Sequence, residues 1–315
     1  MSAIWRQGLA ALAALLLSLS ALACPVPDRV VPVSAADDHE LTVATQNLWR
    51  LVAAELSAEQ QQARLRAWSR QLRDVLQYPH ILVVQEVDTL TMLESLAAQV
   101  VADGGPRYRS LLIDGNDPSG IDVAVLVREP VQVGKVQALF ARQRQGQHWL
   151  FSRPPLHVEI VAPLRFDLLA LHLRSGHGLD DRQRAARVKS TREAQAKAVR
   201  RWAEGRMAEG RALLLAGDLN SAPTADDYGV PLAILDRPPL WSAWQKVPEP
   251  ERFSYIYRCQ RQAIDHLLLS PSLRERVVRV EVSRGNAGRY RTLYGSGGAG
   301  TVVSDHDALK AYLRF

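Results

Sequence analysis

The sequence has few cysteines and few long apolar runs. These shortages exclude several classes of metal-binding, redox and membrane-spanning protein. Cys24 and Cys259 are the only cysteines among 315 residues, so no metal site can be built from clustered thiolates. No CxxC pair is present, which excludes the dithiol redox chemistry of that motif. The apolar run at residues 9–19 is too short to cross a bilayer securely as a helix.

The chain also lacks internal repeats and an internal linker. Compositional bias is confined to residues 25–38 and the glycine-rich segment 295–300. With 47% hydrophobic residues, the rest can bury one sizeable core. We therefore expect a linker at residues 24–40 and a single domain at residues 41–315.

The first 23 residues have the pattern of a secretory leader. Arg6 precedes the apolar run, and small residues stand immediately before Cys24. Residues 1–23 are therefore predicted to be a signal peptide, and the mature protein to be exported to the periplasm, the medium or the cell envelope. Cys24 leaves two outcomes open: simple cleavage, or a bacterial lipoprotein signal that makes this cysteine a lipid anchor.

Net charge and the two cysteines give only weak information on partners and disulfide bonds. The formal net charge is +6, which favours polyanionic partners such as nucleic acid. In an oxidising compartment Cys24 and Cys259 could form one disulfide, whereas lipidation of Cys24 would leave Cys259 unpaired. No protein partner is indicated.

Hydrophobic periodicity predicts many strands and few helices. Helical spacing of apolar residues predicts helices from Ser57 to about residue 76, at 89–100 and at 181–206. Short apolar runs predict strands at residues 41–46, 81–87, 108–113, 122–128, 156–161, 166–173, 212–216, 254–257, 266–269, 277–282 and 309–313. Such a pattern favours two packed sheets flanked by helices.

Short polar motifs follow many of these apolar runs in a fixed order. They are TQNLW at residues 45–49, QE at 85–86, LHL at 171–173, GDLN at 217–220, IDH at 264–266 and SDH at 304–306. Polar ends of several strands can converge into one pocket. Carboxylates, carboxamides and histidines gathered there suit a divalent cation and a phosphate.

In this order the motifs resemble the endonuclease/exonuclease/phosphatase superfamily, the deoxyribonuclease I-like metal-dependent phosphoesterases. The resemblance runs from about residue 41 to residue 315. It implies a four-layer αββα sandwich, in which two packed mixed sheets are flanked by helices and the active site lies at one end of the sheets.

The resemblance implies a metal site with oxygen ligands. Glu86, at the end of the run ILVVQE, is expected to be the main ligand for Mg²⁺, with Mn²⁺ as a substitute. Asn47 is expected to ligate or orient the ion through its carboxamide oxygen, unless it only caps a turn. Asp305 is expected to lie toward the same ion.

The catalytic residues follow from the same motifs. Asp218 is expected to hold or deprotonate the attacking water, and Asn220 to donate to a phosphoryl oxygen. Their alternate spacing would direct both side chains to one side of an extended segment. His306 is expected to act as an acid or base oriented by Asp265, and His172 to contact the phosphate.

Further residues are weaker candidates for substrate or orienting contacts. Asp122 is expected to orient His172, and Arg174 to contact phosphates. Tyr255 and Tyr257 alternate in a strand and could either reach the substrate or fill one face. His266, next to Asp265, could serve only in packing. The arginines at positions 182, 184 and 187 could contact phosphates, although a solvated helix face explains them as well.

The sequence thus predicts an exported, divalent-metal-dependent phosphodiesterase, and a nuclease acting on DNA or RNA above all. One alternative is a phosphodiesterase or phosphatase for a phospholipid or small phosphate ester on the same scaffold. Another is a catalytically inert surface-binding protein. The complete set of polar motif residues argues against this alternative. A calcineurin-like binuclear enzyme is disfavoured because GDLN is not followed by that family's GNH motif.

Overall fold

The computed structural model describes residues 26–27, 29–289 and 302–315. The predicted leader and Cys24 lie outside these residues. Among the described residues the helices are α2 (Ala58–Asp74), α3 (Leu90–Ala102), α4 (Ala185–Ala208), α5 (Val230–Leu235) and α6 (Pro271–Arg274). Three short 3₁₀ turns, at Ala53–Glu55, Ala243–Lys246 and Glu249–Glu251, complete the helical segments.

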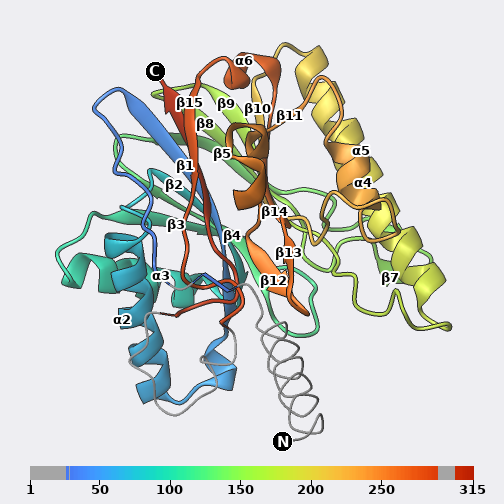
Figure 1. The fold of residues 1–315 in the computed structure, drawn as a ribbon, viewed down its shortest axis with the longest axis horizontal. Helices are drawn as coiled ribbons and strands as arrows, with labels where there is room; N and C mark the ends of the chain where they lie inside the picture. The colour runs from blue at the N-terminus through green and yellow to red at the C-terminus, as the bar shows by residue number, and fades with distance from the viewer. Residues whose placement is uncertain (1–25, 28, 290–301) are drawn as a thin grey trace, which may run out of the picture.

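Two six-stranded mixed sheets form the centre of the molecule (Figure 1). The first has the order β15 (Val277–Val282), β16 (Leu309–Arg314), β1 (Glu40–Leu51), β2 (Ile81–Val87), β4 (Asp122–Arg128) and β3 (Tyr108–Leu112). The second has the order β11 (Trp241–Ser242), β14 (Asp265–Leu269), β10 (Leu213–Asp218), β9 (Phe166–His172), β8 (Leu156–Ala162) and β5 (Gln132–Ala138). Two small hairpins add β6 (Arg144–Gln145) with β7 (His148–Trp149), and β12 (Tyr255–Tyr257) with β13 (Gln260–Gln262).

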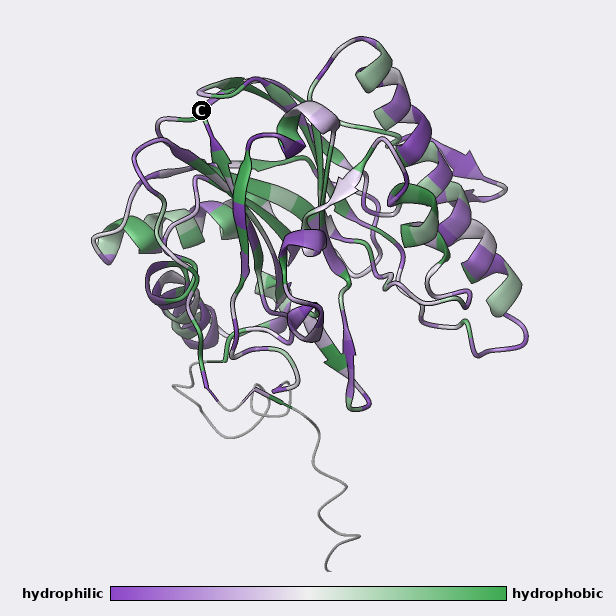
Figure 2. Ribbon diagram, turned by 45° about the horizontal axis from the view of Figure 1, so that its top comes forward, coloured by the Kyte–Doolittle hydropathy of each residue, from purple (hydrophilic) through white to green (hydrophobic). Residues whose placement is uncertain are grey.

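Alternation along the central strands explains the four layers. In β2, Ile81 and Val83 enter the core between the two sheets, whereas Leu82 and Val84 enter a second core beneath α2 and α3. The second sheet is covered on its outer face by α4 and α5 in the same way. Because both faces of a central strand are buried, its sequence is continuously apolar. Figure 2 shows these strands as hydrophobic and the outer helices as mixed. The predicted four-layer αββα sandwich is confirmed.

Local signals explain where the helices begin. Ser57 accepts a hydrogen bond from the Gln60 N–H at 3.2 Å, and the Gln60 side chain accepts from the Ser57 N–H at 2.8 Å, so a capping box starts α2. The predicted helix at 181–206 begins later, at residue 185. Asp181 instead forms a turn and accepts from the backbone of residues 183 and 184.

The main element missing from the sequence prediction is β5. It lies at the edge of the second sheet, and most of its residues are exposed or half-buried, so the apolar signal is weak. Part of the predicted linker also contacts the domain: Val31 pairs with Arg284, and Val33 is buried. Among the described residues, no helix is both long and apolar enough to span a bilayer.

Candidate active site

The central strands of both sheets bring the polar motifs to one edge of the sandwich. In the second sheet, Asp218 at the end of β10 stands opposite His172 of the parallel strand β9 and Asp265 of the antiparallel strand β14. In the first sheet, Asn47 of β1 stands opposite Gln85 of β2, next to Glu86. Carboxyl ends of parallel strands and amino ends of their antiparallel neighbours therefore meet at this edge, as the sequence pattern predicts.

Glu86 reaches the site because β2 is irregular at that point. Gln85 pairs with Val123 and the residue after Glu86 pairs with Asp122, so Glu86 is an extra residue in the ladder. Its φ is 65°, which is unusual for a residue with a side chain. Its carboxylate accepts hydrogen bonds from Asn47 Nδ2 at 3.1 Å and from the Arg50 N–H at 3.0 Å.

Both ends of the Asn47 carboxamide form hydrogen bonds at this edge. Its Oδ1 accepts the Trp49 N–H at 2.8 Å, which is the turn-capping alternative. Its Nδ2 donates to Glu86 Oε1 at 3.1 Å and to Asp218 Oδ2 at 3.3 Å. The oxygen has a second lone pair, so its role toward an ion stays a prediction. Through its Nδ2, Asn47 links two carboxylates and fixes their orientation.

The motif at residues 217–220 covers the end of β10 and the sharp turn that follows it. Gly217 has a φ of 146°, and a Cβ atom there would lie 1.9 Å from the Leu171 carbonyl oxygen, so glycine is required. Asn220 has a φ of 49°, and its N–H donates to Asp218 Oδ1 at 2.7 Å. The predicted extended segment is wrong, because this turn brings the two side chains to the site. Asn220 Nδ2 also donates to the Leu173 carbonyl at 3.1 Å.

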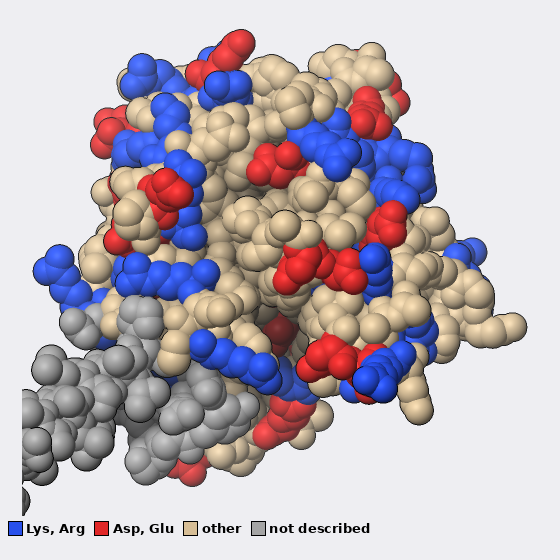
Figure 3. Space-filling view, turned by 45° about the vertical axis from the view of Figure 1, so that its right-hand side comes forward, with Lys and Arg blue, Asp and Glu red and all other residues tan. Residues whose placement is uncertain are grey.

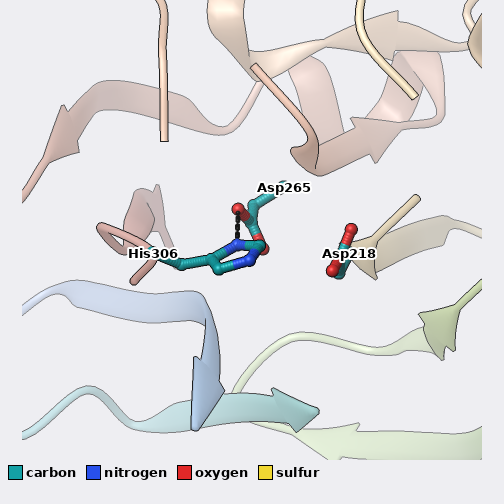
Figure 4. Close-up of side chains that lie close together, drawn as sticks. All are labelled: Asp218, Asp265 and His306. Atoms are coloured by element: carbon teal, nitrogen blue, oxygen red, sulfur yellow. Dashed lines mark hydrogen bonds and ion pairs between the residues drawn. The ribbon is translucent and has the colours of Figure 1, made fainter. Parts of the chain in front are cut away.

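His306 and Asp265 form the predicted pair. His306 Nδ1 lies 2.7 Å from Asp265 Oδ2, and both side chains are buried. Figure 4 shows that Asp218 lies near this pair on a separate strand. Asp265, Asp218 and His306 each offer a ligand atom within 4.8 Å of the others.

Burial and neighbouring charges shift the pKa values of Asp218 and His306, so the two side chains differ in protonation state. Burial and the nearby Asp265 carboxylate raise the pKa of Asp218 to about 7. Burial opposes the charge on His306, but the carboxylates of Asp265 and Asp305 outweigh it and raise the pKa of His306 well above its usual value. Near neutral pH, His306 is therefore a cation that can donate a proton, and Asp218 is poised to accept one.

His172 lies at the opposite side of Asp218, with Nε2 3.6 Å from Asp218 Oδ2. Burial lowers its pKa well below the usual value, so the ring is neutral at neutral pH. Its buried Nδ1 has no hydrogen-bond partner among the described residues. Asp122 therefore does not orient it: Asp122 Oδ2 instead accepts the Gly115 N–H at 3.0 Å. That expectation is wrong because the loop at residue 115 turns back onto Asp122.

The site residues fit a divalent cation. Glu86, Asp218 and Asp305 line one cavity, and burial together with neighbouring negative charge raises the pKa of both aspartates. A cation would relieve this repulsion, and oxygen ligands suit Mg²⁺ or Mn²⁺. The geometric cluster of Asp218, Asp265 and His306 fits less well, because His306 Nδ1 is already bonded to Asp265 and a protonated imidazole is not a ligand. Glu86 and Asp305 are therefore the better ligand pair.

The cavity has a volume of about 1150 Å³ and contains residues that the sequence did not single out. Arg153 lines it and holds the loop near residue 117 through a 2.8 Å bond to Asp117 Oδ2. Tyr228 also lines it, with its hydroxyl 3.4 Å from Gln262 Oε1. Both come from irregular segments with no periodic pattern, so neither was found from the sequence. Tyr255 and Tyr257, by contrast, were candidates and do line the cavity.

The arginines proposed as phosphate contacts lie beside the cavity lining or at the start of α4. Arg174 is not among the residues that line the cavity. Gln195 and Arg192 of α4 bind its backbone N–H and carbonyl and hold this segment against the helix, and contact of its side chain with phosphates stays a prediction. In the helix-start cluster, Arg184 bonds to Asp181 at 2.7 Å, and Arg187 lies 3.4 Å from a histidine ring nitrogen.

His266, next to Asp265, packs beneath the site. Its Nε2 lies 2.9 Å from the Ser221 carbonyl oxygen, and its side chain is buried. The packing role that the sequence left open for this histidine is therefore the one that the structure shows.

One buried arginine supports the site from behind. Arg192 of α4 is 1% exposed, and its guanidinium donates to the backbone carbonyls of Arg174, Asn220 and Tyr228 at 2.7, 2.9 and 2.6 Å. These bonds tie the turn after β10 and the loop before α5 to the long helix. Arg192 is thus a positioning residue for Asn220.

The comparisons with known proteins agree with this architecture. A model of the Endonuclease/Exonuclease/phosphatase family matches residues 44–306, which is most of the chain. No curated protein sequence is significantly similar to the chain.

Solved structures share the fold at low sequence identity. Truncated Caenorhabditis elegans TDP2 is 19% identical, with a TM-score of 0.59 over 88% of this chain and 98% of that chain. An endonuclease/exonuclease/phosphatase family protein from Bacteroides thetaiotaomicron has the same identity, coverage and TM-score. A variant of the 3′ phosphatase NExo from Neisseria, bound to a product DNA hairpin, is 18% identical, with a TM-score of 0.59 over 87% of this chain and 100% of that chain.

Proposed function

Because the chain belongs to the endonuclease/exonuclease/phosphatase family, whose members are divalent-metal-dependent phosphoester hydrolases, we propose that it is an exported Mg²⁺-dependent phosphodiesterase that cleaves nucleic acid. The observation that carries this proposal is the meeting of Asp218, the His306–Asp265 pair and Glu86 in one cavity. These groups come from both sheets, and packing of the core explains neither their number nor their proximity. An inert binding protein would have no need for them.

Each residue has a distinct part in hydrolysis. Asp218, with a pKa of about 7, orients a water molecule and accepts its proton. His306, held as a cation by Asp265, donates a hydrogen bond to a phosphoryl oxygen. Asn220 lies in the same cavity as a neutral donor. Glu86 and Asp305 would hold the divalent cation, which when bound neutralises charge on the phosphate.

Nucleic acid is the preferred substrate class for two reasons. The cavity of about 1150 Å³ is larger than a small phosphate ester requires. Its wall also contains Tyr255 and Tyr257, aromatic rings that can stack on nucleobases. Among the structural neighbours, one was crystallised with single-strand DNA product and another with a product DNA hairpin.

Export is part of the proposal because of the leader pattern alone. Mature protein isolated from its native host should begin at Cys24, either unmodified or carrying lipid, and mass measurement distinguishes the two forms. Recovery of the mature protein with Met1 still attached would refute export.

The function is tested with purified protein and a panel of substrates. Single-stranded DNA, duplex DNA, RNA, phospholipid vesicles and a sugar phosphate are each incubated after EDTA treatment and again with added Mg²⁺ or Mn²⁺. We expect cleavage of nucleic acid only with metal, loss of cleavage in Asp218→Asn, and full cleavage in Asp74→Asn, which alters an exposed carboxylate on α2. Metal-dependent hydrolysis confined to phospholipid or sugar phosphate would replace the nucleic-acid proposal.

A further inference from the structure

Three neighbouring rings, those of His306, Tyr255 and Tyr257, lie in a row along the wall of the cavity. The ring of Tyr255 lies 4.8 Å from that of His306, with an interplanar angle of 35°. Tyr257 stacks on Tyr255 at 6.4 Å and 11°. Both tyrosines line the cavity, and Tyr257 is 49% exposed. Because about half of Tyr257 is exposed, part of its ring is available to a planar ligand group.

The backbone of the β12–β13 hairpin holds this ring in place. Tyr257 pairs with Gln260, so only Arg258 and Cys259 form the turn, and their φ values are 46° and 64°. Two consecutive positive φ values are typical of a type I′ hairpin turn, which asparagine and glycine normally occupy. The tight turn places the Arg258 guanidinium 5.2 Å from the centre of the Tyr257 ring. The cost of left-handed backbone at two residues with side chains is consistent with a functional position.

The charge around the cavity restricts what else the ligand can be. Besides the catalytic carboxylates, Asp180, Asp226 and Asp227 line it, against Arg153 and Arg258. Figure 3 shows basic and acidic side chains interspersed on this face, with acidic groups beside the hollow. Such a wall does not attract a long run of phosphates. A ligand with one central phosphate and an unpaired planar base suits both the mixed charge of this wall and the exposed ring of Tyr257.

We propose that Tyr255 and Tyr257 form a stacking platform for an unpaired nucleobase next to the scissile phosphate, so that the protein selects single-stranded or frayed nucleotide units. The inference rests on the proposed function and specifies its substrate. Stacking of a base on an aromatic side chain contributes about 1–3 kcal/mol, or roughly 5- to 150-fold in binding. Duplex interiors, in which bases are already stacked, would be poor substrates.

The test uses two dinucleotides that each contain a single phosphodiester, so the cleaved bond is unambiguous. One is thymidylyl-thymidine, and the other is the same dimer with both bases replaced by hydrogen. We expect wild-type kcat/KM to favour the base-bearing dimer by at least about 5-fold. Tyr257→Ala should reduce that preference several-fold, mainly through KM, and Tyr257→Phe should restore it because the ring is retained.

A matched control is Trp149→Ala. Trp149 is an exposed aromatic, 38% exposed with Arg144 4.2 Å from its ring centre, but it does not line the cavity. Its removal should leave the preference for the base unchanged. A wild-type preference below about twofold, or an equal loss on both dimers in Tyr257→Ala, would overturn the platform.

A binding measurement separates this inference from the proposed function. The wild-type protein in EDTA is titrated with a dinucleotide that contains 2-aminopurine, whose fluorescence is quenched by stacking. Quenching that is lost in Tyr257→Ala and kept in Tyr257→Phe supports the platform even if neither dimer is hydrolysed, in which case only the proposed function fails. Absence of quenching with the wild type overturns the platform even if DNA is cleaved.

Discussion

The Nδ1 atom of His306 lies 2.7 Å from Oδ2 of Asp265, across the boundary between the two sheets. Asp265 begins β14 in the second sheet, and His306 shortly precedes β16 in the first, so the pair depends on the packing of one sheet on the other. The same hydrogen bond fixes the ring so that Nε2 is directed away from Asp265 and remains available to the substrate. The geometry of the His306–Asp265 pair therefore depends on the packing of the core between the two sheets.

The pH dependence of kcat/KM should reflect this pair. Activity should rise with pH as Asp218 loses its proton and fall at higher pH when His306 loses its own. A bound cation should place the acid limb below the metal-free pKa of Asp218, which is about 7. Asp265→Asn removes the charge that supports the imidazolium, so the alkaline limb should move down by about 1–3 pH units. An alkaline limb at the same pH in Asp265→Asn would contradict the assigned role of the pair.

Asp218→Asn should separate activity from stability. Loss of the proton acceptor should lower kcat by a factor on the order of 10² or more. The pKa of Asp218 is raised on folding, so this group disfavours the folded state above its unfolded pKa and does so fully above about pH 7. The variant should therefore be at least as stable as wild type at about pH 8, with the difference shrinking toward about pH 4. Urea unfolding at both pH values measures the difference in the free energy of unfolding. A lower stability of Asp218→Asn than of wild type at the higher pH would contradict the raised pKa of Asp218.

Metal activation should depend on Asn47 through the hydrogen bonds that its amide donates. Its amide bonds to Glu86 and Asp218 orient carboxylates that face the cation. Loss of such supporting bonds typically weakens metal affinity by about 10- to 100-fold. Asn47→Ala should raise the Mg²⁺ concentration for half-maximal activity by that factor, whereas His39→Ala, at an exposed position, should not. An unchanged Mg²⁺ titration would remove Asn47 from this role.

Much of this site follows from sequence because apolar runs determine where strands end. ILVV before Gln85 and LLLA before Gly217 are buried on both faces, so the polar residues that follow must emerge at one edge. What could not be predicted depends on single backbone angles and loop contacts. The positive φ of Glu86 and the direction of the Asn47 amide have no periodic signal. Arg153 comes from a loop with no regular pattern.

Arg192 had a signal that the sequence interpretation did not use. It stands four residues after Val188 and seven before Val199, which are both buried, so it is a charged residue on the apolar face of α4. Such a residue must find partners when buried. Strand β5 was missed for a different reason. It is a mostly polar edge strand, so it lacks the alternation of apolar and polar residues from which strands are predicted.

Arg192→Met should therefore be destabilising and should also impair catalysis. Three carbonyls, those of Arg174, Asn220 and Tyr228, would lose their donor, at a total cost of about 3 kcal/mol or more in the free energy of unfolding. Arg187→Met, at an exposed position on the same helix, should change it by less than about 0.5 kcal/mol. Equal stabilities of the two variants in chemical denaturation would show that the three bonds contribute nothing.

Asp167 determines stability far from the active site. It is fully buried at the start of β9 and accepts hydrogen bonds from His157, Arg206 and Arg211. Burial opposes its ionisation, but the hydrogen bonds from Arg211, His157 and Arg206 outweigh it and lower its pKa to about 2. A depressed carboxyl pKa stabilises the folded state above the unfolded pKa, and this contribution is lost as pH falls through the folded pKa.

Asp167→Asn should thus cost about 2 kcal/mol in the free energy of unfolding at neutral pH. The difference from wild type, measured by urea unfolding, should shrink between about pH 4 and pH 2. Catalysis at neutral pH should persist, because the residue lies at the opposite end of β9 from His172. A stability difference that does not change with pH across this window would show that packing, and not the ionised carboxylate, is what Asp167 contributes.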